Sequence, residues 1–335
     1  MNKGAGLFDE EYKLERISKL GDPLEKLNST INWEIFRSIL NKHLKVEGVA
    51  PGGRPPFDYV MMFKILILQE YFGLSDEQME YQITDRFSFM RFLGLRIHSK
   101  VPDRNTIWNF REKMKVDALM EKLFNQFGKE LVKQGLIVNK GKIIDATIMN
   151  APKQRNSREE NNQIKRGEIP EEWSDKKSSH KDVDATWTQK NNKNYFGYKD
   201  HVKVDGKKKF IDSYQVTEAS VHDSVGALDL LSKKDKGQSL HADSAYTGEA
   251  FEKAVSKIGM KNKIHEKGYR NNPLSEGQKE MNSKKSKIRA RVEHVFGFMH
   301  QSTGGVIIRT IGAKLKIGLL NLTYNLFRYS YYMKA

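Results

Sequence analysis

The chain has 335 residues, with 58 basic and 42 acidic side chains and no cysteine. A chain of this length commonly folds into two domains and buries a sizeable core. The lack of cysteine excludes disulfides, thiol nucleophiles, iron–sulfur clusters and cysteine-ligated zinc. The longest apolar run, Tyr59 to Leu68, is too short to span a bilayer, and residues 1–10 lack the pattern of a secretion signal. We therefore expect a soluble cytoplasmic protein.

The net charge of +16 is concentrated near the C-terminus. Residues 251–335 carry 17 basic and 5 acidic side chains, whereas residues 1–150 carry 23 and 20. A local excess of positive charge is typical of a surface that binds a polyanion. Nucleic acid is the first candidate for that partner, and a merely solvated surface is the alternative.

The first 137 residues have the apolar spacing of helices, and we predict an all-α DNA-binding domain there. Asn32, Ser75 and Asp103 stand where helix caps are expected, and Ser75 with Gln78 forms a capping-box pattern. One helix is expected after Asn32, and the others cover residues 57–72, 75–84, 103–114 and 116–131.

The helix that begins at Asp103 is our candidate reader of DNA, supported by helix 75–84 in a helix-turn-helix-like arrangement. Its expected DNA contacts are Arg104, Asn105, Asn109 and Arg111. Arg54, in the break Gly52-Gly53-Arg54, belongs either to a minor-groove arm or to a simple linker.

From about residue 140 the pattern changes to that of strands and helices in alternation. Strands are predicted over residues 142–149, 195–204, 209–217, 239–242 and 261–265, with helices over 222–231, 248–258 and 283–301. A polar segment, residues 150–194, is interpreted as a loop or insertion. This order predicts an α/β catalytic domain with a ribonuclease-H-like mixed five-stranded sheet over residues 138–335.

Two aspartates follow strands that this topology makes neighbours. Asp145 lies late in the first strand, within an otherwise apolar run, and Asp243 directly follows the fourth. Two carboxylates this close repel each other unless a cation lies between them. Hard divalent ions such as Mg²⁺ prefer oxygen ligands and keep waters for a phosphate substrate. The alternative is that Asp145 ends a strand and Asp243 caps the helix after it.

Glu293 is the third candidate carboxylate, on the last predicted amphipathic helix. At about 100° per residue, its direction differs from that of the apolar residues Ile288, Val292, Val295 and Met299 by roughly 130°. The helix can therefore pack on the sheet while Glu293 faces the site. Arg289, one turn earlier, can pair with Glu293 or clamp a phosphate oxygen, and an ordinary surface pair is the alternative.

These motifs together resemble a DDE transposase of the insertion-sequence type, in the four/five superfamily and close to its "five" family. The resemblance covers most of the chain, from about Gly52 to Arg328. It rests on several motifs in the family's order: GRPPFDYVMMFKILILQEYFGLSDEQMEYQITDRFSFMRFLGL, VPDRNTIWNFREKM, IIDATIMNAP, NYFGYKDHVKVD, VTEASVHDS, LHADSAYTG and RARVEHVFG.

The resemblance implies that Asp145, Asp243 and Glu293 are the catalytic, metal-binding triad. It further implies two Mg²⁺ ions, for which Mn²⁺ substitutes, acting in cleavage and strand transfer on terminal inverted repeats and target DNA. A homodimer on the DNA is expected because an element has two ends; neither a membrane nor a small-molecule substrate is expected. The cellular site is then the cytoplasm, in association with the nucleoid.

The sequence departs from the family around the glutamate, where Ser286 and His300 replace the usual Tyr and Lys while Arg289 and Glu293 are kept. The basic residues of this region are expected to follow the phosphate backbone. They are Lys284, Lys285, Lys287, Arg289 and Arg291, with His300 also expected at the DNA. A transposase-derived DNA-binding protein without catalysis and a metal-dependent nuclease of the same fold are the alternative functions.

Overall fold

The computed structural model describes residues 8–45, 55–116, 118–302 and 305–333. The chain divides into two compact units. The first comprises the described residues up to Leu131 together with those from Leu319 onward, and the second runs from Val132 to Gly318. The sequence analysis assigned the last residues of the chain to the catalytic domain, whereas in the structure they complete the helical unit.

The first unit is helical, as predicted. Its caps are those expected from the sequence: Asn32 accepts a hydrogen bond from the Glu34 amide, Ser75 and Gln78 form a capping box, and Asp103 accepts from the Thr106 amide. The elements are α1 (Asp9–Lys19), α2 (Pro23–Thr30), the 3₁₀ turn η1 (Trp33–Phe36), α3 (Arg37–Leu44), α4 (Tyr59–Phe72), α5 (Asp76–Asp85), α6 (Phe87–Leu93), α7 (Arg104–Lys113), α8 (Leu119–Lys133) and the second part of α15 (Ala313–Tyr332).

The core of this unit forms around α4, which buries nearly its whole circumference. Two aromatic contacts attach α15 to it. The ring of Phe327 stacks on Tyr71 of α4 with 3.7 Å between centroids, and Tyr329 meets Phe127 of α8 edge-on at 5.6 Å. Burial of large aromatic surface explains why the last helix belongs to this unit.

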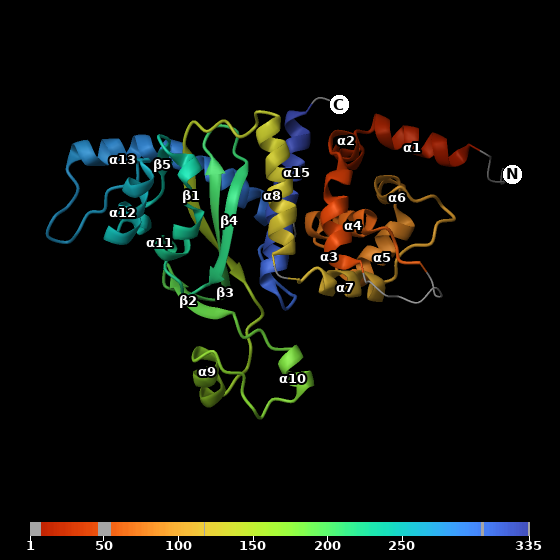
Figure 1. Cartoon of the computed structure of the whole chain (residues 1–335), viewed down its shortest axis with the longest axis horizontal. Coiled ribbons are helices and arrows are strands. Elements are labelled where there is room, and N and C mark those ends of the chain that lie inside the picture. Colours follow the sequence, from red (N-terminus) through yellow and green to blue (C-terminus); the bar gives the residue numbers. More distant parts are fainter. Residues whose placement is uncertain (1–7, 46–54, 117, 303–304, 334–335) are drawn as a thin grey trace. The chain divides into compact units, whose positions relative to one another are not determined.

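The second unit contains a mixed sheet with six strands among the described residues (Figure 1). The strands are β1 (Lys142–Asn150), β2 (Thr186–Lys190), β3 (Lys193–Asp205), β4 (Ile211–Glu218), β5 (Ser239–His241) and β6 (Lys261–Asn262). β1 pairs antiparallel with β3 and parallel with β5, β4 pairs antiparallel with β3, and β6 pairs parallel with β5. Without β2, the order β4-β3-β1-β5-β6 is the predicted ribonuclease-H-like sheet.

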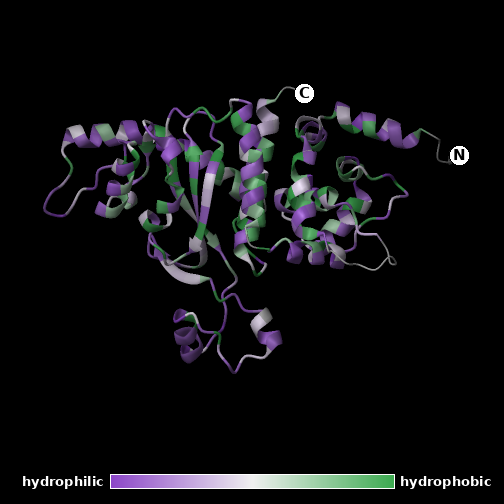
Figure 2. Ribbon diagram, viewed as in Figure 1, coloured by the Kyte–Doolittle hydropathy of each residue, from purple (hydrophilic) through white to green (hydrophobic). Residues whose placement is uncertain are grey.

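The additional strand, β2, lies in the polar segment interpreted as a loop, so five strands was an undercount. Asn191 and Asn192 both have positive φ angles, 52° and 58°, which is the backbone of a tight hairpin turn between β2 and β3. The rest of the segment forms α9 (Arg158–Lys165) and α10 (Asp175–Ser179). Figure 2 shows α9 as mainly hydrophilic.

Gly197 on β3 is the residue at which this excursion leaves and rejoins the sheet. It is opposite Asn150 of β1 on one edge and Thr186 of β2 on the other. Its φ is 151°, and a Cβ atom there would come within 2.1 Å of the Met149 carbonyl oxygen. Only glycine therefore allows β1 to approach β3 so closely at this rung.

The remaining elements of the second unit follow the sheet in chain order. They are α11 (Asp223–Gly226), the 3₁₀ turns η2 (Leu228–Leu230), η3 (Lys233–Asp235) and η4 (Ser244–Tyr246), then α12 (Glu249–Ile258), α13 (Glu276–Arg289), the 3₁₀ turn η5 (Ala290–Val292), α14 (Glu293–Ser302) and the start of α15. A cluster of buried apolar side chains packs against β1 and β5, with Ile144, Leu240, Phe251 and Val255 among its members.

Two helix predictions need correction. The helix expected over 222–231 is the short α11 followed by η2, and the helix expected over 283–301 begins earlier, at Glu276, and is interrupted by η5. None of the helices in the described part of the chain is long and apolar enough to cross a membrane.

Candidate active site

Asp145 lies on β1, which has β3 on one edge and β5 on the other. Its side chain is 12% exposed, and Oδ1 accepts a hydrogen bond of 2.9 Å from the Ala146 amide. Burial raises the pKa of Asp145 to about 6; the positive charge of Arg289 opposes the rise, and the negative charges of Asp243 and Glu293 add to it. Asp145 is thus a largely desolvated carboxylate that lies in the field of two others.

Asp243 stands two residues beyond the end of the β1–β5 pairing. In this parallel register Ile143 is opposite His241, and Asp145 and Asp243 each follow that pair by two residues. Asp243 is half-buried, and its Oδ1 accepts a hydrogen bond of 2.8 Å from the Ala245 amide, which caps η4. The cap interpretation and the site interpretation are therefore both compatible with its position.

Glu293 opens α14, directly after the 3₁₀ turn η5. Its side chain is 60% exposed, whereas Val292, Val295 and Met299 are fully buried. The helix thus buries its apolar face while the Glu293 carboxylate points away from that face, as predicted. The continuous-helix geometry on which the angles were based is broken at Ala290–Val292.

Arg289, the last residue of α13, connects two of the three carboxylates. Its Nη1 donates a hydrogen bond of 2.5 Å to Asp145 Oδ2, and its Nη2 lies 3.8 Å from Glu293 Oε1. The sequence predicted a pair with Glu293, and the shorter contact is with Asp145. Proximity in space across 144 residues of chain could not be inferred from helical spacing.

The donor set fits a hard divalent cation, since it consists of carboxylate oxygens alone. Among the described residues no three acidic or histidine side chains converge closely enough to form a metal site. The positive charge at the carboxylates is that of Arg289, which bonds to Asp145 Oδ2. A cation bound by Asp145 would have to share or replace that bond.

The basic residues predicted to meet DNA near Glu293 divide into two groups. Three of them are engaged within the unit: Arg289 bonds to Asp145, Lys285 donates to the Ile264 carbonyl at 2.9 Å, and Arg291 donates to the Gly206 carbonyl at 2.6 Å. The others are exposed, namely Lys284, which pairs with Glu280 on the same helix, Lys287 and His300.

In the first unit α7 packs on α5, the helix that was predicted to support it. The Arg104 amide donates to Glu80 Oε2 at 2.8 Å, and the side chains of Arg104, Asn105 and Asn109 are exposed. Arg111 is instead held by both oxygens of Asp76, at 2.5 and 2.7 Å. Arg54 lies outside the described residues.

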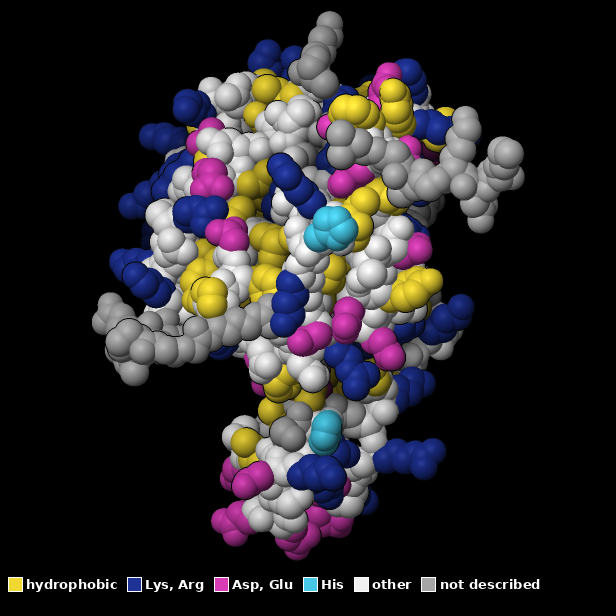
Figure 3. All heavy atoms as spheres, turned by 90° about the vertical axis from the view of Figure 1, so that its right-hand side faces the viewer, with side chains coloured by type: hydrophobic (Ala, Val, Ile, Leu, Met, Phe, Trp, Pro, Cys, Tyr) yellow, Lys and Arg dark blue, Asp and Glu magenta, His cyan; other side chains and the backbone are white. Residues whose placement is uncertain are grey.

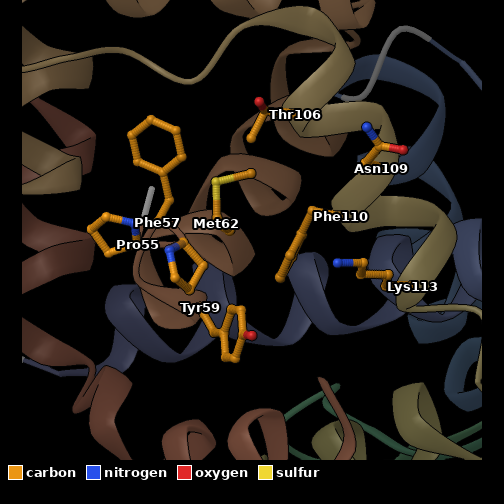
Figure 4. A pocket seen from close by; sticks show the side chains of 9 residues that line it. Pro55, Phe57, Tyr59, Met62, Thr106, Asn109, Phe110 and Lys113 are labelled. Carbon is orange, nitrogen blue, oxygen red and sulfur yellow. The ribbon is translucent and has the colours of Figure 1, made fainter. Parts of the chain in front are cut away.

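Asn109 also borders a pocket of about 250 Å³ between the start of α4 and α7 (Figure 4). Its walls are mostly apolar, and α7 and Tyr59 of α4 supply its polar groups. It is lined by Pro55, Pro56, Phe57, Tyr59, Met62, Thr106, Asn109, Phe110 and Lys113.

Tyr246 is the residue near the site that the sequence analysis missed. It ends η4, the turn that Asp243 caps, and its side chain is fully buried. A tyrosine three residues after a candidate ligand, in the segment Ala242-Asp243-Ser244-Ala245-Tyr246, was the available signal.

Comparison with known proteins completes this description. Residues 139–326 match the family model described as a transposase DDE domain, and residues 12–113 match one described as a transposase domain (DUF772). A solved structure, the piggyBac transposase synaptic complex with hairpin DNA, is similar with a TM-score of 0.48 and 13% identity. That match covers 94% of this chain and 76% of the piggyBac chain.

Proposed function

This chain belongs to the family of transposases with a DDE catalytic domain, and we propose that Asp145, Asp243 and Glu293 are its three carboxylates. The protein is accordingly a DNA transposase of the insertion-sequence type, a metal-dependent enzyme of DNA cleavage and strand transfer. Its closer placement in the "five" family remains a prediction.

One observation supports the residue assignment: the last β1–β5 pair is Ile143 with His241, and Asp145 and Asp243 each follow that pair by two residues. Arg289 adds the link to Glu293, because its guanidinium bonds to Asp145 and lies 3.8 Å from Glu293. Burial is the main cause of the raised pKa of Asp145, and the charges of Asp243 and Glu293, on two other elements, add to it.

We propose that these oxygens hold two Mg²⁺ ions, which Mn²⁺ can replace. Bound there, the ions would stabilise the attacking and leaving oxygens of an in-line phosphoryl transfer. The side chains take part in no covalent step and would only hold the ions. Water or a 3′-hydroxyl attacks phosphorus, and the bridging oxygen of the cleaved phosphodiester leaves. Ionised Asp145 is needed for this binding, so we expect activity to fall as the pH drops through about 6.

We propose that the DNA follows the exposed basic residues near Glu293. Lys284, Lys287 and His300 extend from α13 and α14 into solvent, in the part of the chain that carries most of the net charge. Lys285, Arg289 and Arg291 act here chiefly by fixing that region, since each already bonds within the unit.

Recognition of the terminal inverted repeats is proposed for α7, through Arg104, Asn105 and Asn109. Arg111 supports that helix from behind by its bond to Asp76. On the face drawn in Figure 3, acidic and basic side chains are interspersed. A few placed side chains, rather than a continuous basic surface, would then select the sequence. We propose that two copies of the chain act together on the two ends, on nucleoid DNA in the cytoplasm.

The decisive experiment is incubation of the full chain with DNA that carries the element's ends and with Mg²⁺, mapping the cut on each strand. The variants Asp145→Asn, Asp243→Asn and Glu293→Gln should bind this DNA but not cut it. Asp229→Asn and Glu276→Gln, exposed residues of the same unit, are the matched controls.

The outcome also separates the alternative functions. A protein that binds ends but never cuts, in Mg²⁺ or Mn²⁺, is a DNA-binding derivative. One that cuts without joining a 3′ end to target DNA is a nuclease. Cutting retained by all three variants would refute the triad.

A further inference from the structure

Tyr246 combines a buried aromatic ring with a hydroxyl that the fold does not use. The side chain is fully buried, and the ring packs on Phe251 of α12 with 5.7 Å between centroids. It belongs to the apolar cluster under β1 and β5, with Ile144 and Leu240. Phenylalanine would fill the same space, so the packing does not account for the hydroxyl.

The Oη atom of Tyr246 has no hydrogen-bond partner among the described residues. A buried donor without an acceptor loses its hydration and gains nothing in return, which destabilises the fold. Buried polar atoms of this kind are uncommon in folded proteins and call for a specific explanation.

The surroundings of Tyr246 indicate where that acceptor lies. Burial raises the pKa of Tyr246 well above its usual value, and the charges of Asp145, Asp223 and Asp243 raise it further. Ile144 and Ala242, which directly precede Asp145 and Asp243 in the chain, belong to the same buried cluster as Tyr246. Asp223 forms an ion pair with Lys199 at 2.8 Å outside the proposed site, whereas Asp145 and Asp243 belong to that site.

Each of these two aspartates already accepts at least one hydrogen bond. Asp145 accepts from Ala146 and Arg289, and Asp243 accepts from Ala245. If a cation takes the position of Arg289 at Asp145 Oδ2, that carboxylate loses a donor. A second donor from inside the core then becomes the group that holds it in place.

We propose that Tyr246 is a positioning residue for metal binding: its hydroxyl donates to the Asp145–Asp243 carboxylate pair, directly or through one bound water. In this way it fixes the orientation in which these oxygens accept a divalent cation. Because the side chain is fully buried, it acts through the carboxylates and does not touch DNA. This inference rests on the proposed function of the triad.

The test uses the full chain without DNA and measures the dissociation constant of Mn²⁺ from the resonance signal of the free ion. In Tyr246→Phe we expect binding to weaken by about 10- to 100-fold, the usual effect of losing a bond to a metal ligand. The melting temperature should stay the same or rise, since an unpaired buried hydroxyl is removed.

Tyr198→Phe is the matched control. Tyr198 is also buried, but its hydroxyl donates to Asp182, on the segment that follows α10. Its loss should lower the melting temperature by a few degrees and leave the Mn²⁺ constant unchanged. Loss of the hydroxyl is thus expected to change the Mn²⁺ constant but not lower the melting temperature at Tyr246, and to do the reverse at Tyr198.

Unchanged Mn²⁺ binding in Tyr246→Phe overturns the inference, and so does weaker binding accompanied by a loss of stability like that of Tyr198→Phe. Failure of the proposed function looks different. In that case the unaltered protein does not bind Mn²⁺, or its binding survives Asp145→Asn and Asp243→Asn, and the role of Tyr246 is refuted with it.

Discussion

Two arginines, one in each unit, make the same short contact with an aspartate in different surroundings. Arg111 Nη1 lies 2.5 Å from Asp76 Oδ1 in the helical unit, and Arg289 Nη1 lies 2.5 Å from Asp145 Oδ2 in the sheet unit. Arg111 binds both oxygens of its partner, whereas Arg289 divides its two terminal nitrogens between Asp145 and Glu293.

The difference separates a structural pair from an exchangeable one. Asp76 is further fixed by Gln69 at 2.8 Å, so its pair with Arg111 closes a network that joins α5 to α7. Asp145 has a pKa raised to about 6, which means that Arg289 compensates its burial only in part. A carboxylate in that condition still favours an additional cation.

Replacing Asp145 with Asn should have the largest effect. A metal ligand is lost, and because metal ions contribute several kcal/mol to such a transition state, we expect cleavage of end DNA to fall by at least about a thousandfold. Gel assays with Mg²⁺ and Mn²⁺ measure it. The exposed control Asp229→Asn should cut at close to the normal rate.

The pH dependence of stability should distinguish the same site. The pKa of Asp145 is raised from 3.8 to about 6 in the folded state, so the folded protein keeps a proton that the unfolded chain has lost. The protonation of Asp145 therefore adds to the free energy of unfolding. This stabilisation is fully present below about pH 4 and is lost as the pH rises through 6, and it amounts to at most about 3 kcal/mol. Urea unfolding in the presence of a chelator, at pH 4.5 and at pH 7, measures the change in the free energy of unfolding. In Asp145→Asn the part of this change that is due to Asp145 should disappear.

Asp76→Asn should lower the free energy of unfolding by about 2 kcal/mol at pH 7. Removing one partner leaves Arg111 with an unpaired charge, and the 14% and 20% exposure of the two side chains keeps the loss below that of a fully buried pair. Urea titration is the measurement, with the exposed Asp85→Asn on the same helix as control. Equal stability of both variants would contradict the structural role.

Arg289→Gln should have the smallest effect, an increase in Mn²⁺ affinity of about tenfold, because a positive charge next to a metal ligand repels the incoming cation. Arg111→Gln should leave the Mn²⁺ constant as it is. Weaker metal binding in Arg289→Gln would show that the guanidinium supports the cation rather than competing with it.

Local chemistry made much of the fold predictable. The capping box of Ser75 and Gln78 and the cap at Asp103 depend on residues three apart, and both are present. The apolar run around Asp145 is the central strand that its β-branched residues indicated. These features depend on interactions between residues close together in the chain, so they can be predicted from the sequence.

Other features depend on contacts between distant residues. The bond from Arg289 to Asp145 joins residues 144 apart, and Phe327 joins the helical unit by stacking on Tyr71. No periodicity encodes either. The β2–β3 hairpin was predictable in principle, since Asn191-Asn192 is a turn signal, but the polar residues around it obscured the strands.

Gly197 has a consequence for the variability of this protein. The chain leaves the sheet after Asn150 and returns at Thr186, and both residues are opposite the same glycine. The ends of the excursion are therefore joined at a single rung, whatever the length of the chain between them. Deletions or a fused reporter within residues 158–179 would change the size of that appendage and leave the spacing from Asp145 to Asp243 untouched, which makes the segment a natural place for engineering.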